Sequence, residues 1–242
     1  MAIQKCSENQ DAGLPRCARN DAGRGLFRIS LGAHLNRIAA SLVALIVILA
    51  PVAAEAVDPC AYDKEAMLSL SENAFDQNLA NGGGGWRAVA KISGCERAAA
   101  GLLAAYRAAH PGSDPMLAWH EGQALASAGE YADAIPLLES ARKPEDQDPT
   151  GWNHYVDATV AFLRHDKAVL LAARQHLTAI KYPIGAGFPP LNDGYVEFRA
   201  PAGQPPVRFR WPPNIEVVDA LVVCFNRPYE EAYGPTCRNR GS

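Results

Sequence analysis

Residues 119–141 read WHEGQALASAGEYADAIPLLESA, and this stretch decides the fold class. It opens with His120-Glu121, like the helix of a zinc protease, in which two histidines four residues apart hold the metal and a glutamate activates water. Here the residue four positions after His120 is Ala124, so the metal-binding pair does not exist. The stretch instead predicts two packed helices joined at Gly129.

The small residues of this stretch predict that the two helices lie close together. Gly122 lacks a side chain, so a second helix can approach there, and Gly129 permits the left-handed backbone that ends a helix. The residues that share one face of the following helix are Tyr131, Ala134, Leu138 and Ala141. We therefore expect helices over residues 116–128 and 130–142.

This segment resembles a tetratricopeptide repeat, a helix-turn-helix unit with a period of 34 residues. The matching residues are Gly122, Leu125, Gly129, Tyr131, Ala134 and Ala141. Trp152 follows Trp119 by 33 residues, but Val156 and Leu163 stand where glycines would recur. One repeat is therefore clear, over residues 115–142, and the flanking ones are degenerate. The resemblance implies an all-α fold of antiparallel helical hairpins.

The resemblance also implies a function. In that family the first helix of each pair lines a groove that binds peptides or other proteins. On this mapping Met116, Trp119 and Gln123 would face the groove. Packing of Trp119 in the core is the alternative interpretation. The resemblance thus implies a protein or peptide partner and no cofactor.

Residues 1–56 are expected to be an export signal with a polar N-terminal extension. Residues 38–53 are almost entirely apolar, follow a basic stretch and precede Ala54-Glu55-Ala56, a small-x-small cleavage site. The apolar run is shorter than the about 20 residues that a membrane-crossing helix needs. A retained N-terminal anchor is the alternative. The long polar stretch before the run predicts a translation start further downstream. Export places the chain in the periplasm or outside a bacterial cell.

The mature chain is acidic and is expected to form one domain over residues 57–242. Removal of residues 1–56 takes away six basic and four acidic residues, which leaves 17 basic against 22 acidic and a net charge of −5. This balance argues against nucleic-acid binding, which depends on lysine and arginine displacing counterions from phosphates. No membrane contact is expected after cleavage.

Four cysteines remain in the mature chain, and an even number in an exported protein predicts two disulfides with three possible pairings. We favour Cys60–Cys95 and Cys224–Cys237, the pairs nearest in sequence, because each closes around a predicted turn. A metal site is disfavoured because the chain has no CxxC spacing.

Helical hairpins are expected over residues 57–181, and a β-hairpin and a C-terminal helix over 182–242. The further helices are predicted at 59–78, 95–110, 151–164 and 166–180. In VRFRW, residues 207–211, apolar residues alternate with Arg208 and Arg210, which predicts a strand with both arginines toward solvent. Residues 215–225 favour a buried helix, although their β-branched residues leave a strand possible.

No catalytic, cofactor-binding or metal-binding residue emerges from the sequence. His120 and His154 are 34 residues apart and would point the same way in adjacent helix pairs, and the glycine loop at 81–85 lacks the lysine of a phosphate loop. A non-enzymatic interaction module is therefore favoured. A cell-envelope hydrolase and a small-ligand carrier are the alternatives.

Overall fold

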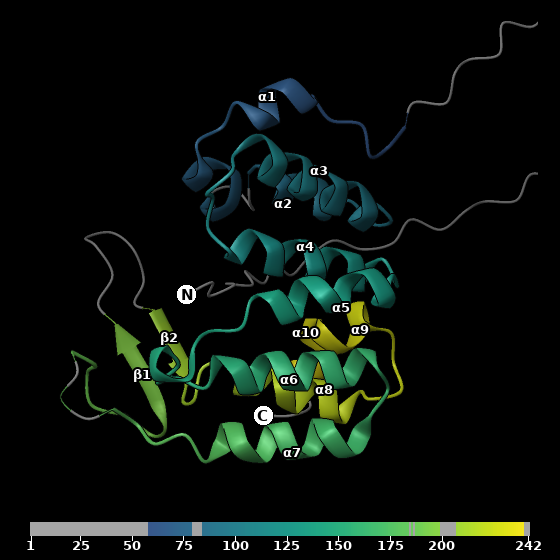
Figure 1. The fold of residues 1–242 in the computed structure, drawn as a ribbon. Helices are drawn as coiled ribbons and strands as arrows, with labels where there is room; N and C mark the ends of the chain where they lie inside the picture. The colour runs from purple at the N-terminus through teal and green to yellow at the C-terminus, as the bar shows by residue number, and fades with distance from the viewer. Residues whose placement is uncertain (1–57, 79–83, 184, 186, 199–206, 240–242) are drawn as a thin grey trace, which may run out of the picture. The chain divides into compact units, whose positions relative to one another are not determined.

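The computed structural model describes residues 58–78, 84–183, 185, 187–198 and 207–239. The predicted export signal, its cleavage site and the alternative anchor all lie outside these residues. The described chain is mainly helical and carries one two-stranded antiparallel sheet (Figure 1), which confirms the prediction of a mainly α fold with a minor β-hairpin. Within the described residues, no helix is long and apolar enough to cross a membrane.

The chain begins with short helices that do not follow the prediction. In place of one helix over 59–78, the structure has α1 (Lys64–Leu68) and a π-helix, η1 (Asn73–Gln77). The prediction was wrong because the caps lie elsewhere: the Asp63 carboxylate accepts from Ala66 N, and the Ser71 hydroxyl accepts from Ala74 N. These local hydrogen bonds start two separate helices. Next come α2 (Trp86–Ala90) and α3 (Glu96–Ala109).

Four longer helices form the middle of the chain: α4 (Met116–Ser127), α5 (Tyr131–Ser140), α6 (Trp152–Leu163) and α7 (Lys167–Thr178). Neighbours in sequence pack against each other, as Figure 1 shows for α3, α4 and α5 and for α6 and α7. Gly129 has the left-handed backbone, φ 82°, that the sequence predicted at the first turn. The Asp166 carboxylate caps α7 by accepting from Val169 N.

Helix α4 is buried along most of its length, with all residues from Leu117 to Gly122, and also Ala124 and Ala126, in the protein interior. A Cβ atom at Gly122 would lie 2.8 Å from Leu138 Cγ and 3.1 Å from the Ala134 carbonyl oxygen, so α5 sits directly against this glycine. Leu117 and Ala124 belong to an N-terminal cluster of buried side chains that also includes residues of α2 and α3. Trp119 and Ala126 belong to a C-terminal cluster formed with α5 to α10.

The remaining elements are strands β1 (Tyr195–Phe198) and β2 (Val207–Arg210) and helices α8 (Ile215–Val223), α9 (Tyr229–Tyr233) and α10 (Pro235–Arg238). The helical interpretation of residues 215–225 is thus confirmed for α8. The strands pair Glu197 with Arg208, and Arg208 is exposed as predicted. Arg210 differs from the prediction, because its guanidinium contacts the buried Asp219 carboxylate on α8 at 3.1 Å.

Two disulfides cross-link the chain. Cys60 bonds to Cys95 and Cys224 bonds to Cys237, which confirms both predicted pairings. The first ties the N-terminal segment to the start of α3, and the second ties the end of α8 to α10. Because disulfides persist in oxidising compartments, the two bonds indicate an extracytoplasmic location.

Candidate functional site

The three residues predicted to face a groove all lie on α4, but in different environments. Trp119 is only 2% exposed, and its ring lies 4.8 Å from that of Trp152 and 5.1 Å from that of Tyr155, measured between ring centroids. Trp119 is therefore a core residue, which is the interpretation that the sequence analysis set against a groove position. Met116 and Gln123 are half-buried.

Gln123 connects α4 to the C-terminal segment. Its amide nitrogen lies 3.4 Å from the Tyr229 hydroxyl and 3.5 Å from the Tyr155 hydroxyl. The backbone N–H of Tyr229 in turn donates to the Tyr131 hydroxyl at 3.1 Å. Helix α9 thus packs on α4, while α8 packs on α6. Helices α8 to α10 form the C-terminal segment. We use the name inner face for the surface of α4 and α6 that this segment contacts.

The end of the chain adds aromatic rings and a cation beside the inner face. Tyr233 stacks on Tyr229, with 5.5 Å between ring centroids, and the Arg238 guanidinium lies 4.5 Å above the Tyr233 ring. Arg238 Nε also donates to the Tyr233 carbonyl at 2.8 Å. Burial raises the pKa of both Tyr155 and Tyr229 well above the usual tyrosine value, so these hydroxyls stay protonated and can donate hydrogen bonds.

A second polar group is centred on the buried carboxylate of Asp76. Its Oδ1 accepts from Trp86 Nε1 at 2.7 Å and lies 2.8 Å from His120 Nδ1. The His120 contact helps to lower the pKa of the Asp76 carboxyl group. Arg87 donates from Nε to the Asp76 carbonyl at 2.7 Å, and its Nη2 lies 3.5 Å from Oδ1. Four polar residues from η1, α2 and α4 therefore meet in the protein interior.

These neighbours control ionisation at Asp76. Burial acts to raise the pKa of the carboxyl group, but His120, Trp86 and Arg87 together outweigh burial and hold the pKa below its ordinary value of 3.8. Burial lowers the pKa of Arg87, although Asp76 and the nearby Tyr233 act in the opposite direction. Asp76 is therefore an ionised carboxylate at neutral pH.

The local sequence explains why Asp76 points inward. The π-helix η1 buries Phe75 and Asp76 together. Gly85, with φ 54°, lies against the backbone of Phe75, and a Cβ atom at Gly85 would overlap the Phe75 carbonyl. Sequence reasoning treated this glycine run as a simple connector and missed the Asp76 group. The sequence signal of the Asp76 group is the pair Phe75-Asp76, followed after eight residues by Gly85-Trp86-Arg87.

The histidines do not assemble a metal centre. Within the described residues, three or more potential metal ligands nowhere come together. The ring of His154 lies 5.4 Å from that of His176, and His154 Nδ1 is buried without a hydrogen-bond partner.

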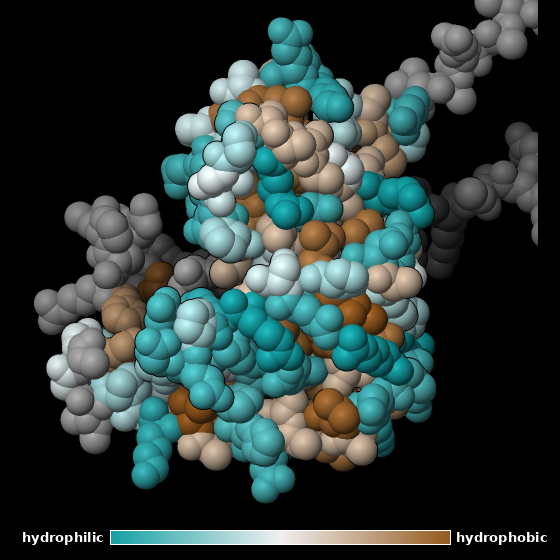
Figure 2. Space-filling model, in the orientation of Figure 1, coloured by the Kyte–Doolittle hydropathy of each residue, from teal (hydrophilic) through white to brown (hydrophobic). Residues whose placement is uncertain are grey.

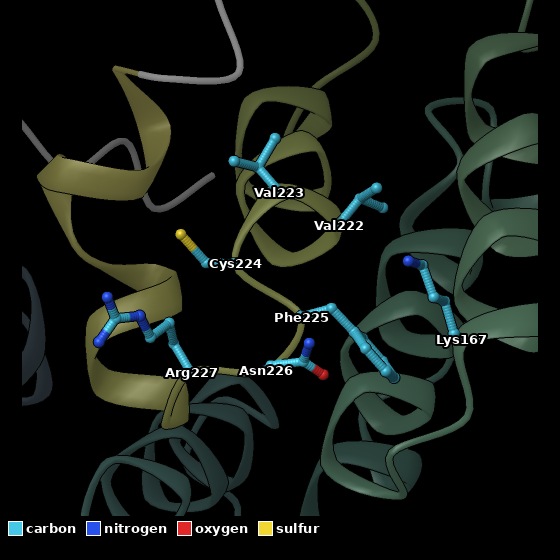
Figure 3. A pocket seen from close by; sticks show the side chains of 7 residues that line it. All are labelled: Lys167, Val222, Val223, Cys224, Phe225, Asn226 and Arg227. Atoms are coloured by element: carbon cyan, nitrogen blue, oxygen red, sulfur yellow. The ribbon is translucent and has the colours of Figure 1, made fainter.

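A surface pocket lies between the start of α7 and the end of α8, lined by Lys167 and residues 222–227. Figure 3 shows the Lys167 amino group near Val222 and Phe225, whereas the Arg227 guanidinium points to the other side of Cys224. Arg227 also pairs with Glu231 at 3.5 Å. Because small-molecule sites depend on polar groups that converge, this pocket does not have the arrangement of one.

Comparison with protein-family models, with curated proteins and with solved structures finds no match for this chain. The inner face and the Asp76 group are therefore candidate sites on the basis of their geometry alone. Of the two, the inner face is the one that already contacts a peptide segment.

Proposed function

We propose that the chain is an exported, tetratricopeptide-like interaction module of the bacterial cell envelope, which binds a protein or peptide at its inner face. The close approach of α4 and α5 at Gly122 supports the likeness, since a glycine at this crossing is what the repeat uses. No catalytic step or cofactor belongs to this proposal.

The observation that carries the proposal is the contact between Gln123 and Tyr229. Gln123, which the repeat likeness would place in a groove, contacts the hydroxyl of a residue 106 positions away, and Tyr131 accepts a hydrogen bond from that residue's backbone. The inner face therefore has the side-chain chemistry to hold a peptide backbone, with the chain's own α9 as the segment held. A partner binds alongside α9, where Met116, Gln123 and Tyr233 remain half-buried and reach the surface.

The distribution of apolar side chains on the surface agrees with a localised binding site. Figure 2 shows apolar side chains on this view as separate patches among hydrophilic ones. Exposed large apolar residues, for example Ile92, Val169 and Val223, are spread along the described sequence. Specific polar and aromatic contacts, rather than a broad apolar surface, would then provide selectivity.

Photo-crosslinking tests this function in cells that export the full chain. A photo-reactive benzoylphenylalanine replaces Tyr233 beside the inner face, and in a matched control it replaces Tyr195 on β1. We expect irradiation to yield an adduct with a second protein from position 233 and not from position 195. Absence of any adduct from position 233, or the same adduct from both positions, would contradict binding at the inner face.

A further inference from the structure

Two histidines lie side by side across the α6–α7 hairpin, although no centre of three or more ligands exists among the described residues. His154 lies nine residues before α6 ends at Leu163, and His176 lies nine residues after α7 begins at Lys167. Because the two helices run antiparallel and pack together (Figure 1), equal distances from the turn place these residues opposite each other. Their ring centroids are 5.4 Å apart.

The surroundings of this pair differ from those of the other histidines in the described chain. His110, His120 and His165 lie against a carbonyl oxygen, a carboxylate and a phenylalanine ring, respectively. Among the described residues, the rings of His154 and His176 have neither a hydrogen bond nor an ion pair, and they contact each other. The hairpin therefore brings together two imidazoles whose ring nitrogens are not used within the fold.

One of these nitrogens is buried. His154 Nδ1 has no hydrogen-bond partner and no contact with solvent. Buried polar atoms in folded proteins are nearly always satisfied, so an unsatisfied one points to a bound water or ion. When Nδ1 carries no proton, its lone pair is available to a metal. His176 is exposed, so an ion can approach the pair from solvent.

The spacing of the two rings fits a shared metal ion. An ion about 2.0–2.1 Å from an imidazole nitrogen lies about 3.2 Å from the ring centre, because the nitrogen is about 1.1 Å from that centre. Two such rings at the tetrahedral angle of about 109° have centres about 5.2 Å apart. The 5.4 Å between the rings of His154 and His176 is close to this value. The two rings are thus separated by the distance that one shared ion requires.

We propose that His154 and His176 bind a first-row transition-metal ion such as Zn²⁺ at the open end of the α6–α7 hairpin. Each imidazole supplies one nitrogen, and water fills the other positions, since no third potential ligand joins the pair within the described part of the chain. Imidazole suits Zn²⁺, Cu²⁺ and Ni²⁺, whereas Mg²⁺ takes oxygen ligands. The inference goes beyond the proposed function and does not depend on it, because α7 is not part of the inner face.

Isothermal titration calorimetry of the exported protein, purified without a histidine tag, tests the inference. The probes are Zn²⁺ and, as the control, Mg²⁺. We expect one Zn²⁺ to bind per chain and Mg²⁺ not to bind. His176→Ala should weaken Zn²⁺ binding about tenfold or more, because one of two protein ligands is lost. The affinity should also fall between about pH 7.5 and about pH 5.5, because a protonated imidazole does not bind a metal.

His165→Ala is the matched control. His165 is exposed and lies in the turn between the same two helices, but its ring stacks on Phe225, with 4.4 Å between ring centroids. This variant should bind Zn²⁺ as the wild type does. Saturating Zn²⁺ should raise the melting temperature of the wild type and of His165→Ala but not that of His176→Ala, because an ion that binds only the folded chain stabilises it. Circular dichroism without metal confirms that each variant is folded.

Absence of Zn²⁺ binding by the wild type overturns the inference. Equal Zn²⁺ affinity of the wild type and His176→Ala also overturns it, since the result would mean an adventitious ion only, held elsewhere on the chain. His154→Gln removes the other ligand and keeps a polar side chain of similar size. Unchanged Zn²⁺ affinity in this variant would show that the two histidines do not share an ion.

Discussion

Asp76 and Asp219 are buried carboxylates that the described chain keeps close to cations. Asp219 contacts Arg174 at 2.5 Å and Arg210 at 3.1 Å, and so joins α7, α8 and β2. Asp76 has the Arg87 guanidinium 3.5 Å from its Oδ1. Because an unpaired buried charge is costly, removal of one member of such a group is more damaging than loss of an exposed pair.

The Asp76 carboxylate is expected to make stability depend on pH. Its pKa is lower in the folded chain than the ordinary 3.8, so the stabilisation is present above pH 3.8 and is lost as pH falls through the folded-state pKa. Asp76→Asn should lower the free energy of unfolding at neutral pH by about 3 kcal/mol. It should also flatten the decline in stability below about pH 4.

Urea denaturation at a series of pH values measures both effects. Asp157→Asn is the matched control, since Asp157 pairs with Arg142 with its side chain 36% exposed. The control should change stability by less than about 1 kcal/mol. If Asp76→Asn retains the acid dependence of the wild type, the carboxylate is not the group that causes it.

Two helical glycines are expected to respond oppositely to the same substitution. At Gly122 a Cβ atom meets Leu138 and the Ala134 carbonyl, so Gly122→Ala should destabilise the chain by about 1–3 kcal/mol. At Gly101, within α3, a Cβ atom meets nothing within 4 Å, so Gly101→Ala should stabilise it by about 0.5–1 kcal/mol. Thermal unfolding monitored by circular dichroism compares the two. An unchanged or raised melting temperature for Gly122→Ala would show that α4 and α5 do not pack as described.

At the scale of elements, the sequence predicted the helices whose ends are marked by nearby residues. It did not predict features that depend on contacts between distant parts of the chain. Helices α4 to α7 were predicted within a few residues, because Gly129 and Asp166 mark their ends locally. Helix α1 and η1 were predicted as one helix, because the sequence does not show that Asp63 and Ser71 each cap a separate helix. The Asp76 group was missed for a related reason, since its members come from three elements and meet only after folding.

The disulfides are expected to stabilise the fold to different extents. The Cys60–Cys95 bond spans 35 residues and the Cys224–Cys237 bond spans 13. Chain-entropy arithmetic gives about 4 kcal/mol for the longer loop and about 3 kcal/mol for the shorter one. Replacing each pair by serines should lower the urea midpoint in that order. The reverse order would mean that the end of α8 and α10 depend on their bond for native packing and not only for loop closure.

At the scale of the whole molecule, α4 couples the N-terminal and C-terminal clusters. Leu117 packs in the first and Trp119 in the second, while Leu125 touches both. Neither cluster can lose α4 and keep its core. This arrangement predicts one cooperative unfolding transition for residues 58–239.

Fluorine NMR of the chain labelled with fluorotryptophan can follow that transition, because the four tryptophans are distributed over the structure. Trp86 reports on the N-terminal cluster and Trp119 on the C-terminal one. Their signals should lose native intensity at the same urea concentration. Separate midpoints would show that the clusters unfold independently and that α4 does not couple them.

The contact between Gln123 and Tyr229 spans 106 positions and has a consequence for biosynthesis. While the chain emerges from the ribosome, α4 lacks one of its covering surfaces until α9 has been made. The native state therefore becomes accessible only near the end of translation, since contacts distant in sequence form late. Until then the side of α4 that Tyr229 contacts stays uncovered.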